Sequence, residues 1–356
     1  RDYARARKIL LEKKKSGYNA KIYEALARIY FFEGDIDEEV KLFKEIDQNN
    51  ELTKITASHL LTSMNYSSNF SQKNYLEYCK KITDKFKVND QILNNLIKIN
   101  CEKDLKIGFL SPDLKEHSVY YFLDTVIDSL KKNSFKVFAF NIREPQELDK
   151  VSIKIKEKCD EWVDLYNFND FDAANEIRKK KINILVDIAG HFARNRFTIF
   201  KYKPAPIQVS WMGYVNTTGI NEIDYILADP NLIKNEEEDL YSEKVIKMPK
   251  IWNCHKGIDE NIEVSEAPFI KNGYLTFGCF NNSSKISENC INVWTKILNN
   301  IKDCRLIIKA STKDSEIAQK KILEKFKKNN VDISRIIFVN HKKEKIDHLK
   351  TYQDID

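Results

Sequence analysis

The sequence predicts an α/β protein in which an all-helical region precedes two domains built on parallel sheets, the second of them incomplete. The first hundred residues space their apolar side chains as helices do. From Asp104 onward, short apolar runs alternate with helical stretches, which is the pattern of a parallel sheet covered by helices on both faces. We therefore expect three regions, at residues 1–100, 101–258 and 270–356.

The helical region is predicted to contain a pair of antiparallel helices. In "KIYEALARIYFFEGDIDEEVKLFKEIDQNN", Leu26 and Ala27 share one helical face, Gly34 interrupts the helix, and Phe43 belongs to the apolar face of a second one. The segment "DYARARKIL" resembles "DIDEEVKLF" 33 residues later, although Glu39 stands where a tetratricopeptide repeat prefers a small residue. Such repeats bind peptides, but so few helices can equally serve only to support the next domain.

Each α/β domain is predicted from its apolar runs. In the first domain the expected strands are 106–110, 135–142, 182–190, 207–212 and 225–229, with a helix over 118–132. In the second they are 275–280, 305–310 and 336–341, with a helix over 287–300. Open α/β sheets bind ligands at the carboxyl ends of their strands, so we expect two such domains to form a ligand cleft there.

Composition and charge exclude several classes of function. The net charge of +6 arises from 59 basic and 53 acidic side chains that are interspersed, which argues against a nucleic-acid partner. The seven cysteines are scattered without a CxxC pair, and neither a signal peptide nor a membrane-length apolar run occurs. We expect a soluble cytoplasmic protein with no membrane partner. Neither an HExxH motif nor a histidine cluster suggests a metal.

Two histidines follow predicted strands of the first domain. His117 stands in "GFLSPDLKEHSVYYF" beside the start of the predicted helix, and His191 follows Gly190 in "DIAGHFARNRF". An imidazole at a strand end can hydrogen-bond a sugar or transfer a proton. A lone loop histidine is more often structural or solvated, so the pattern alone leaves both interpretations open.

The second domain offers a candidate phosphate site at the end of its first strand. In "TFGCFNNSSKISENCINVW", Asn282 and Lys285 come directly before a helix that Ser287 would cap. Free N–H groups at a helix start, together with a lysine, suit a pyrophosphate. The alternative is a well-capped helix beside a solvated lysine. The dinucleotide and ATPase glycine motifs are missing from the sequence.

Prolines and glycines gather in "KPAPIQVSWMGYVNTTG", residues 203–219, which holds two of the seven prolines and two of the nine glycines. Pro204 and Pro206 predict a rigid entry into a strand, and Gly213 and Gly219 predict a turn after it. We expect this turn to face the ligand cleft. The alternative is a plain connection between a strand and a loop.

Four segments, taken in order, resemble glycosyltransferase family 41, which contains the nucleocytoplasmic O-GlcNAc transferases and their SPINDLY-like relatives. They are "KIGFLSPDLKEHSVYYF", "KPAPIQVSWMGYVNTTGINEIDYILADP" followed by "YSEK", "NGYLTFGCFNNSSKIS", and "DHLKTYQDID". The resemblance runs from about residue 55 to the last residue. "HSVYYF" and "FNNSSKI" resemble the SPINDLY-like branch, some of whose members transfer fucose from GDP-fucose.

This resemblance implies a GT-B fold of two Rossmann-like domains after tetratricopeptide repeats. It implies inverting, metal-independent transfer of a sugar from a nucleotide sugar to Ser or Thr of polypeptide acceptors bound through the repeats, with no cofactor. UDP-GlcNAc is the expected sugar donor and GDP-fucose the alternative. Two further alternatives are a non-catalytic repeat scaffold and a GT-B enzyme that builds a soluble or lipid-linked glycan.

The resemblance also assigns site residues by position. His117 matches the family's active-site histidine, and Lys285 matches the lysine that neutralises the donor pyrophosphate. Three further matches to positions that contact the sugar donor are Asn282, Lys345 and His348. The turn after strand 207–212 is assigned to the acceptor or sugar side, with the candidates His191, Tyr214, Thr217 and Thr218.

The sequence departs from the family pattern at three points. Lys203 replaces an arginine and Val215 replaces a proline, both mild changes. The sequence stops at Asp356, before the threonine-rich segment with which the family binds the nucleotide. We therefore expect the 356-residue chain to bind the sugar donor poorly and to be inactive alone.

Overall fold

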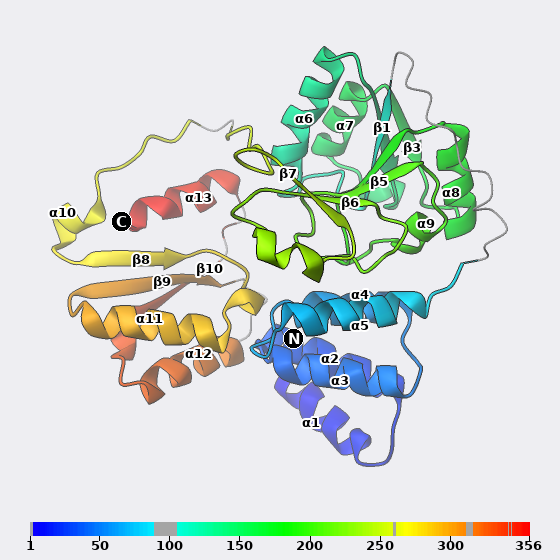
Figure 1. Cartoon of the computed structure of the whole chain (residues 1–356). Helices are drawn as coiled ribbons and strands as arrows, with labels where there is room; N and C mark the ends of the chain where they lie inside the picture. The colour runs from blue at the N-terminus through cyan, green and yellow to red at the C-terminus, as the bar shows by residue number, and fades with distance from the viewer. Residues whose placement is uncertain (1–2, 89–104, 259–260, 311–315, 341, 343) are drawn as a thin grey trace. The chain divides into compact units, whose positions relative to one another are not determined.

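The computed structural model describes residues 3–88, 105–258, 261–310, 316–340, 342 and 344–356, and the chain divides into two compact units (Figure 1). Unit 1 contains Arg1–Leu52, Ser63–Phe70 and Ile258–Asp356. Unit 2 contains Thr53–Thr62 and Ser71–Gly257. The described part of the predicted helical region consists of helices joined by short non-helical segments, and its residues 89–100 lie outside the described part.

Unit 2 is built on a sheet of seven strands that all run parallel. The order across the sheet is β3-β2-β1-β4-β5-β6-β7. The strands are β1 (Lys106–Ser111), β2 (Lys136–Asn141), β3 (Glu161–Asp164), β4 (Ile184–Asp187), β5 (Ile207–Ser210), β6 (Tyr225–Ala228) and β7 (Lys244–Lys247). This arrangement confirms the predicted α/β fold with a parallel sheet.

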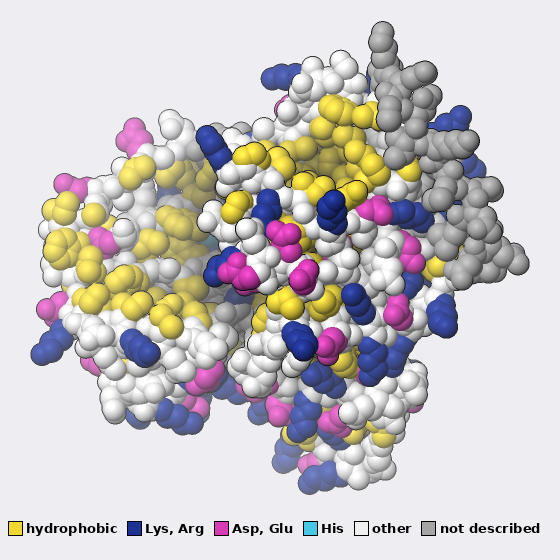
Figure 2. Space-filling model, in the orientation of Figure 1, with side chains coloured by type: hydrophobic (Ala, Val, Ile, Leu, Met, Phe, Trp, Pro, Cys, Tyr) yellow, Lys and Arg dark blue, Asp and Glu magenta, His cyan; other side chains and the backbone are white. Residues whose placement is uncertain are grey.

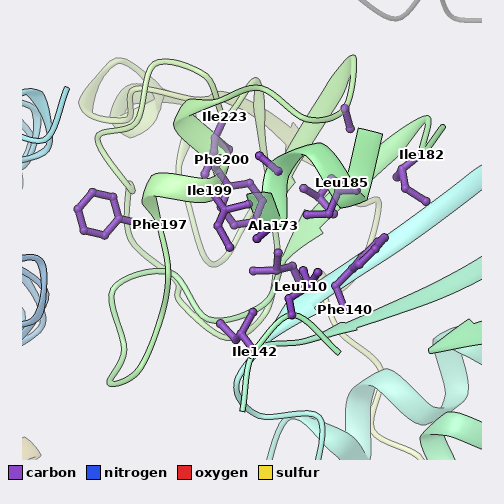
Figure 3. Close-up of a cluster of buried hydrophobic side chains, with 14 of the residues drawn as sticks. Leu110, Phe140, Ile142, Ala173, Ile182, Leu185, Phe197, Ile199, Phe200 and Ile223 are labelled. Atoms are coloured by element: carbon purple, nitrogen blue, oxygen red, sulfur yellow. The ribbon is translucent and has the colours of Figure 1, made fainter. Parts of the chain in front are cut away.

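Helices cover both faces of this sheet because each face carries its own apolar layer. On one face, Ala173 of α8 (Asp170–Lys179) and Phe200 of α9 (Thr198–Lys201) belong to one buried cluster with Phe140 and Leu185 of the strands (Figure 3). A second cluster joins the sheet to α6 and α7. Its members include Phe109, Val137 and Val186 from strands, Leu123 and Ile127 from α6 (Tyr120–Lys132), and Ile155 from α7 (Lys150–Lys158).

The predicted strand 182–190 ends earlier than expected, at Asp187. The Asp187 carboxylate accepts hydrogen bonds from the backbone N–H groups of Ala189 at 2.9 Å and Gly190 at 3.0 Å. These bonds turn the chain out of the sheet just after the strand. The side chains of residues 188–191 are therefore positioned by a tight turn rather than by strand pairing.

Strands β3 and β7 occur where the sequence predicts none. Both lie at the edges of the sheet, and their sequences, "EWVD" and "KVIK", mix charged with apolar residues. An edge strand is only partly buried, so it carries too few apolar residues to be recognised as a buried run.

The helical part of the chain confirms the predicted helix pair. Helix α2 (Ala20–Glu33) ends at Gly34, whose φ of 75° is left-handed, and α3 (Ile36–Gln48) follows directly. Helix α1 (Tyr3–Lys14) precedes them in unit 1. Helices α4 (Lys54–Met64) and α5 (Gln72–Asp84) follow, and α5 belongs to unit 2. The assignment of these helices to tetratricopeptide repeats stays a prediction.

Unit 1 also contains a parallel sheet of three strands in the order β10-β9-β8. They are β8 (Leu275–Cys279), β9 (Cys304–Ala310) and β10 (Ile336–Asn340), as predicted within one or two residues. The remaining helices are α10 (Pro268–Asn272), α11 (Glu288–Asn300), α12 (Glu316–Lys328) and α13 (Lys345–Lys350). Ser287 caps α11 as predicted, because its hydroxyl accepts from the N–H of Cys290 at 3.3 Å.

Acidic and basic side chains are interspersed on the face shown in Figure 2. No helix within the described residues is long and apolar enough to cross a membrane.

Candidate functional site

The order of the strands in unit 2 marks where its ligand edge lies. Strand β1 pairs with β2 on one side and with β4 on the other, so the chain reverses its direction of winding between β1 and β4. In open parallel sheets, ligands bind outside the carboxyl ends of the strands at such a switch point. The loops after β1 and after β4 are therefore the candidate ligand loops of this unit.

His117 lies in the loop after β1, and its side chain is exposed. Its backbone carbonyl accepts a hydrogen bond from Tyr120 N at 3.0 Å, which starts helix α6. Its ring Nδ1 accepts a long hydrogen bond, 3.4 Å, from the backbone N–H of Val119. With Nδ1 as an acceptor, the neutral ring carries its proton on Nε2 and can donate a hydrogen bond from that atom.

Arg143, which the sequence does not single out, fixes the start of the His117 loop. Its guanidinium donates to Pro112 O at 2.6 Å and contacts Asp113 and Glu147. Arg194 binds the same Glu147 carboxylate at 2.6 Å. Hydrogen bonds from Arg194 and then Arg143 lower the pKa of Glu147 to about 2. The loop after β1 is thus tied to those after β2 and β4.

The turn after β5 packs tightly against the turn after β4. A Cβ at Gly213 would lie 1.8 Å from the carbonyl oxygen of Ile188, and one at Gly190 would lie 2.2 Å from Cβ of Tyr214. Only glycine permits these approaches, which explains the glycine of the predicted turn. The Tyr214 hydroxyl is hydrogen-bonded to that of Tyr75 in α5. The local prediction of a strand leading into a glycine turn is confirmed.

His191 is fully buried, at 0% exposure, and serves as an internal hydrogen-bond donor. Its Nε2 lies 2.7 Å from Thr218 O and 3.6 Å from Sγ of Cys79 in α5. A carbonyl oxygen can only accept a hydrogen bond, so Nε2 carries the ring proton and donates the hydrogen bond to Thr218 O. Among the described residues, the buried Nδ1 atom has no hydrogen-bond partner. Burial lowers the pKa of His191 to about 4, so the ring is neutral at physiological pH.

Glu243, from the "YSEK" segment, holds the same turn from the other side. Its buried carboxylate accepts from the hydroxyl of Thr217 at 2.7 Å, from the backbone N–H of Thr218 at 2.7 Å, and from the Thr218 hydroxyl. Charge-assisted hydrogen bonds of this kind are stronger than neutral ones. The glutamate of "YSEK" is the one sequence feature that points to this role, and it does so only as part of the resemblance to family 41.

The structure thus brings the four candidates for the acceptor or sugar side into one buried cluster. Their exposed fractions are 0% for His191, 4% for Tyr214, and 0% for Thr217 and Thr218. In this structure these side chains hold the turn together through internal hydrogen bonds. Their contact with an acceptor or a sugar stays a prediction.

In unit 1, the candidates for binding the sugar donor gather at the carboxyl edge of the three-stranded sheet. Asn282 and Lys285 follow β8, and Lys345 and His348 follow β10. The Asn282 side chain accepts from Ser284 N at 3.1 Å and so shapes the short helix Ser283–Lys285. The exposed Lys285 ammonium has no ion-pair or hydrogen-bond partner among the described residues. That cation is available to an anionic ligand.

His348 is contacted by Lys309, a residue that no sequence motif indicates. Lys309 lies in β9, and its ammonium is hydrogen-bonded to Nδ1 of His348 in α13. The ring centroids of Phe280 and Tyr352 lie 6.3 Å and 5.6 Å from the centroid of the His348 ring. No local sequence pattern predicts this contact, because the two residues belong to different elements and lie 39 positions apart in the chain.

Within the described residues, no group of three or more His, Cys, Asp and Glu side chains could hold a metal ion.

The family model of glycosyl transferase family 41 matches residues 35–258, which is more than half of the chain. The chain belongs to this family. The match covers the whole seven-stranded sheet of unit 2, including the loops that carry His117 and the turn after β5. The expected membership of family 41 is therefore confirmed.

Similar proteins within family 41 include plant proteins. One from Solanum lycopersicum, named "Probable UDP-N-acetylglucosamine--peptide N-acetylglucosaminyltransferase SPINDLY", is 30% identical over 262 residues, or 72% of this chain and 28% of that protein. A protein of the same name from Oryza sativa subsp. japonica is 31% identical over 263 residues, with the same coverage of 72% and 28%. The chain spans less than a third of the length of these curated relatives.

A solved structure resembles the chain over nearly its whole length. It is an O-GlcNAc transferase mutant from Thermobaculum terrenum, with a TM-score of 0.84 at 22% sequence identity. The similarity covers 95% of this chain and 64% of that one. At this identity the likeness concerns the fold, and it confirms the predicted α/β fold of the GT-B type.

Proposed function

We propose that this chain is part of a protein O-glycosyltransferase that transfers a sugar from a nucleotide sugar to Ser or Thr of polypeptide acceptors. The observation that carries the proposal is the Lys285 ammonium at the carboxyl edge of β8, in a family 41 chain, without a partner among the described residues. A departing nucleoside diphosphate develops negative charge, and a fixed cation placed beside that charge lowers the barrier.

Each candidate residue then has a chemical role. Lys285 neutralises the diphosphate of the sugar donor without a metal, and the start of α11 adds free N–H groups beside it. Asn282 keeps the Lys285 segment in its compact turn. His117 binds or orients the acceptor hydroxyl, which attacks from the face opposite the leaving group so that the anomeric configuration inverts.

The expected sugar donor is UDP-GlcNAc, and GDP-fucose is the second candidate. The names of the plant relatives support UDP-GlcNAc. The segments "HSVYYF" and "FNNSSKI" support the SPINDLY-like branch, in which GDP-fucose is used by some members. The nucleotide sugar acts as a substrate, and the proposal includes no cofactor. Polypeptide acceptors would reach the site through the helices of the N-terminal region.

The test is a transfer assay with both sugar donors. The purified full-length protein that contains this chain is incubated with UDP-GlcNAc or GDP-fucose and a protein acceptor, and mass spectrometry locates sugar on Ser or Thr. Lys285→Ala is expected to lower kcat by about 10² to 10³, as is typical when one preorganised charge beside the developing negative charge is removed. Transfer from neither donor would overturn the enzymatic proposal in favour of a non-catalytic scaffold.

Two variants serve as controls. Lys296→Ala removes an exposed lysine of the adjacent helix α11 and is expected to leave transfer unchanged. His117→Ala is expected to abolish most transfer while leaving the affinity for the free nucleoside diphosphate unchanged. If Lys296→Ala loses as much activity as Lys285→Ala, the effect is a general loss of surface charge, and the role proposed for Lys285 is wrong.

A further inference from the structure

Lys309 is a buried cation that pairs with no carboxylate of the described residues. It is the next-to-last residue of β9, and only 7% of its surface is exposed. Its ammonium lies 5.9 Å from the centre of the Phe280 ring and contacts Nδ1 of His348. Among the described residues, no acidic side chain pairs with it.

Burying the charge of this lysine lowers the free energy of unfolding. Burial lowers the pKa of the Lys309 ammonium, and the positive charge of Lys342 lowers it further. A buried charge without an anionic partner is less favourable than an apolar side chain of similar volume, such as methionine. A merely structural requirement at this position of β9 would therefore favour an apolar residue over lysine.

The contact also determines where His348 carries its proton. A lysine ammonium has three N–H donors and no acceptor, so Nδ1 of His348 must supply the lone pair. A neutral imidazole with a lone pair on Nδ1 carries its proton on Nε2. The Phe280 and Tyr352 rings lie beside the imidazole, with ring centroids 6.3 Å and 5.6 Å from its centroid.

We propose that Lys309 is a positioning residue that holds His348 as the neutral tautomer protonated on Nε2. His348 then acts as a hydrogen-bond donor toward an acceptor atom of the nucleotide sugar and not as a proton acceptor at Nδ1. The part of this inference that concerns the nucleotide rests on the proposed function. The part that concerns the tautomer rests only on the contact between Lys309 and His348.

The tautomer is tested by NMR of protein labelled with ¹⁵N at histidine, with the His348 signals assigned by their loss in His348→Gln. In the unsubstituted protein, Nδ1 of His348 is expected to resonate as an unprotonated nitrogen and Nε2 as a protonated one. Lys309→Met is expected to give averaged signals of two tautomers. Lys309→Arg is expected to restore the original pattern, because arginine also only donates. Protonation at Nδ1 in the unsubstituted protein, or an unchanged spectrum in Lys309→Met, would overturn the proposal.

A stability measurement separates positioning from a structural role. Because the buried charge is unfavourable, Lys309→Met is expected to be at least as stable as the unsubstituted protein in urea denaturation. Lys350→Met, at an exposed lysine of the same helix as His348, is the matched control and should change neither the stability nor the histidine spectrum. A clear loss of stability in Lys309→Met would mean that the lysine is structural.

Nucleotide binding is measured by calorimetric titration of the full-length protein that contains this chain, with UDP and with GDP. Lys309→Met is expected to weaken the binding of the preferred nucleotide about tenfold, and Lys309→Arg to stay within about threefold. Equal weakening in both variants would overturn the positioning role. If neither nucleotide binds the unsubstituted protein, the proposed function fails at this edge of the sheet, whereas the NMR result still decides the tautomer.

Discussion

The Glu39 carboxyl of helix α3 is a buried acid that has no cationic partner among the residues that the structure describes. It is 4% exposed, Ser63 is its only hydrogen-bonding side chain among the described residues, and its Oε2 has no partner there. Burial raises the pKa of Glu39 from the ordinary 4.5 to about 8. The predicted repeat pattern expects a small residue at this position, and a small side chain would avoid burying a carboxyl there.

The first prediction concerns the pH dependence that Glu39 produces. A raised folded-state pKa contributes stability that is complete below about pH 4.5 and is lost as the pH rises through about 8. Glu39→Gln imitates the protonated acid, so it should be more stable than the unsubstituted protein by more than about 1 kcal/mol at pH 9 and nearly equal to it at pH 4.5. Urea denaturation at the two pH values measures the difference.

The control is Glu38→Gln, which changes the exposed neighbour of Glu39 in the same helix. It should leave the pH dependence of stability as it was. A similar gain at pH 9 in both variants would show that net charge, and not the burial of Glu39, is responsible.

The second prediction concerns the acid limb of the stability profile. The pKa of His191 is lowered by burial to about 4, so its contribution to stability is complete above about pH 6.5 and is lost as the pH falls toward 4. His191→Gln, which cannot be protonated, should show a smaller loss of unfolding free energy between pH 7 and pH 4.5. The exposed His255 supplies the control variant, His255→Gln. An unaltered acid limb in His191→Gln would contradict the assignment.

At the scale of elements, the turn after β5 shows how a small residue sets the position of a loop. Gly213 approaches the backbone of Ile188 so closely that no side chain fits between them. Thr217 and Thr218 are held by Glu243, and His191 donates to the carbonyl of Thr218. The turn is therefore held by the turn after β4, by the segment before β7 and, through the hydroxyl contact between Tyr75 and Tyr214, by helix α5.

The third prediction follows from that close approach. Gly213→Ala places a Cβ against a backbone carbonyl that cannot rotate away, so we expect a loss of about 1 to 3 kcal/mol in unfolding free energy. Gly278→Ala is the matched control, because its Cβ would meet only the side chain of Ile355, which can change rotamer. Guanidinium denaturation measures both variants. Equal losses would mean that the contact with Ile188 is not the cause.

The elements also show where prediction from sequence fails. Strands β1, β2, β4, β5 and β6 are apolar runs buried in the sheet, and the sequence predicts all of them. The edge strands β3 and β7 are missed because each buries only part of its surface, so no apolar run is needed. The end of β4 is also misjudged, since the Asp187 side chain turns the chain before the apolar run is complete.

At the scale of the whole molecule, ionic contacts between residues far apart in sequence join the two ends of the chain within unit 1. Within unit 1, Lys321 of α12 binds Glu33 at 3.0 Å and also binds Asp35, 288 and 286 positions away. Arg7 binds the same Glu33 carboxylate, whose side chain is fully buried. The helices at the start of the chain thus share a buried ionic contact with the last α/β region.

The fourth prediction tests this contact. Lys321→Met removes one of the two cations from a buried carboxylate, which is expected to cost about 1.5 to 3 kcal/mol of unfolding free energy. Lys320→Met changes the exposed neighbour and should cost little. Urea denaturation followed by circular dichroism compares them. If the two variants are equally stable, Arg7 alone satisfies Glu33, and the contact does not stabilise the unit.

The sequence by itself determined the fold class, the order of the buried strands along the chain, the helix pair with Gly34 between its two helices, and membership of family 41. These features depend on apolar period, turn residues and short motifs, which are properties of neighbours along the chain. For the same reason the sequence could name His117 and Lys285, because each lies in a loop directly after a predicted strand.

Only the tertiary structure decided which side chains are buried and what they contact. His191 is enclosed by Cys79 and Thr218, and Glu243 holds a turn that lies 25 residues before it. Lys309 reaches His348 from another element altogether. Such contacts form where separate elements pack together, and local spacing carries no information about that packing.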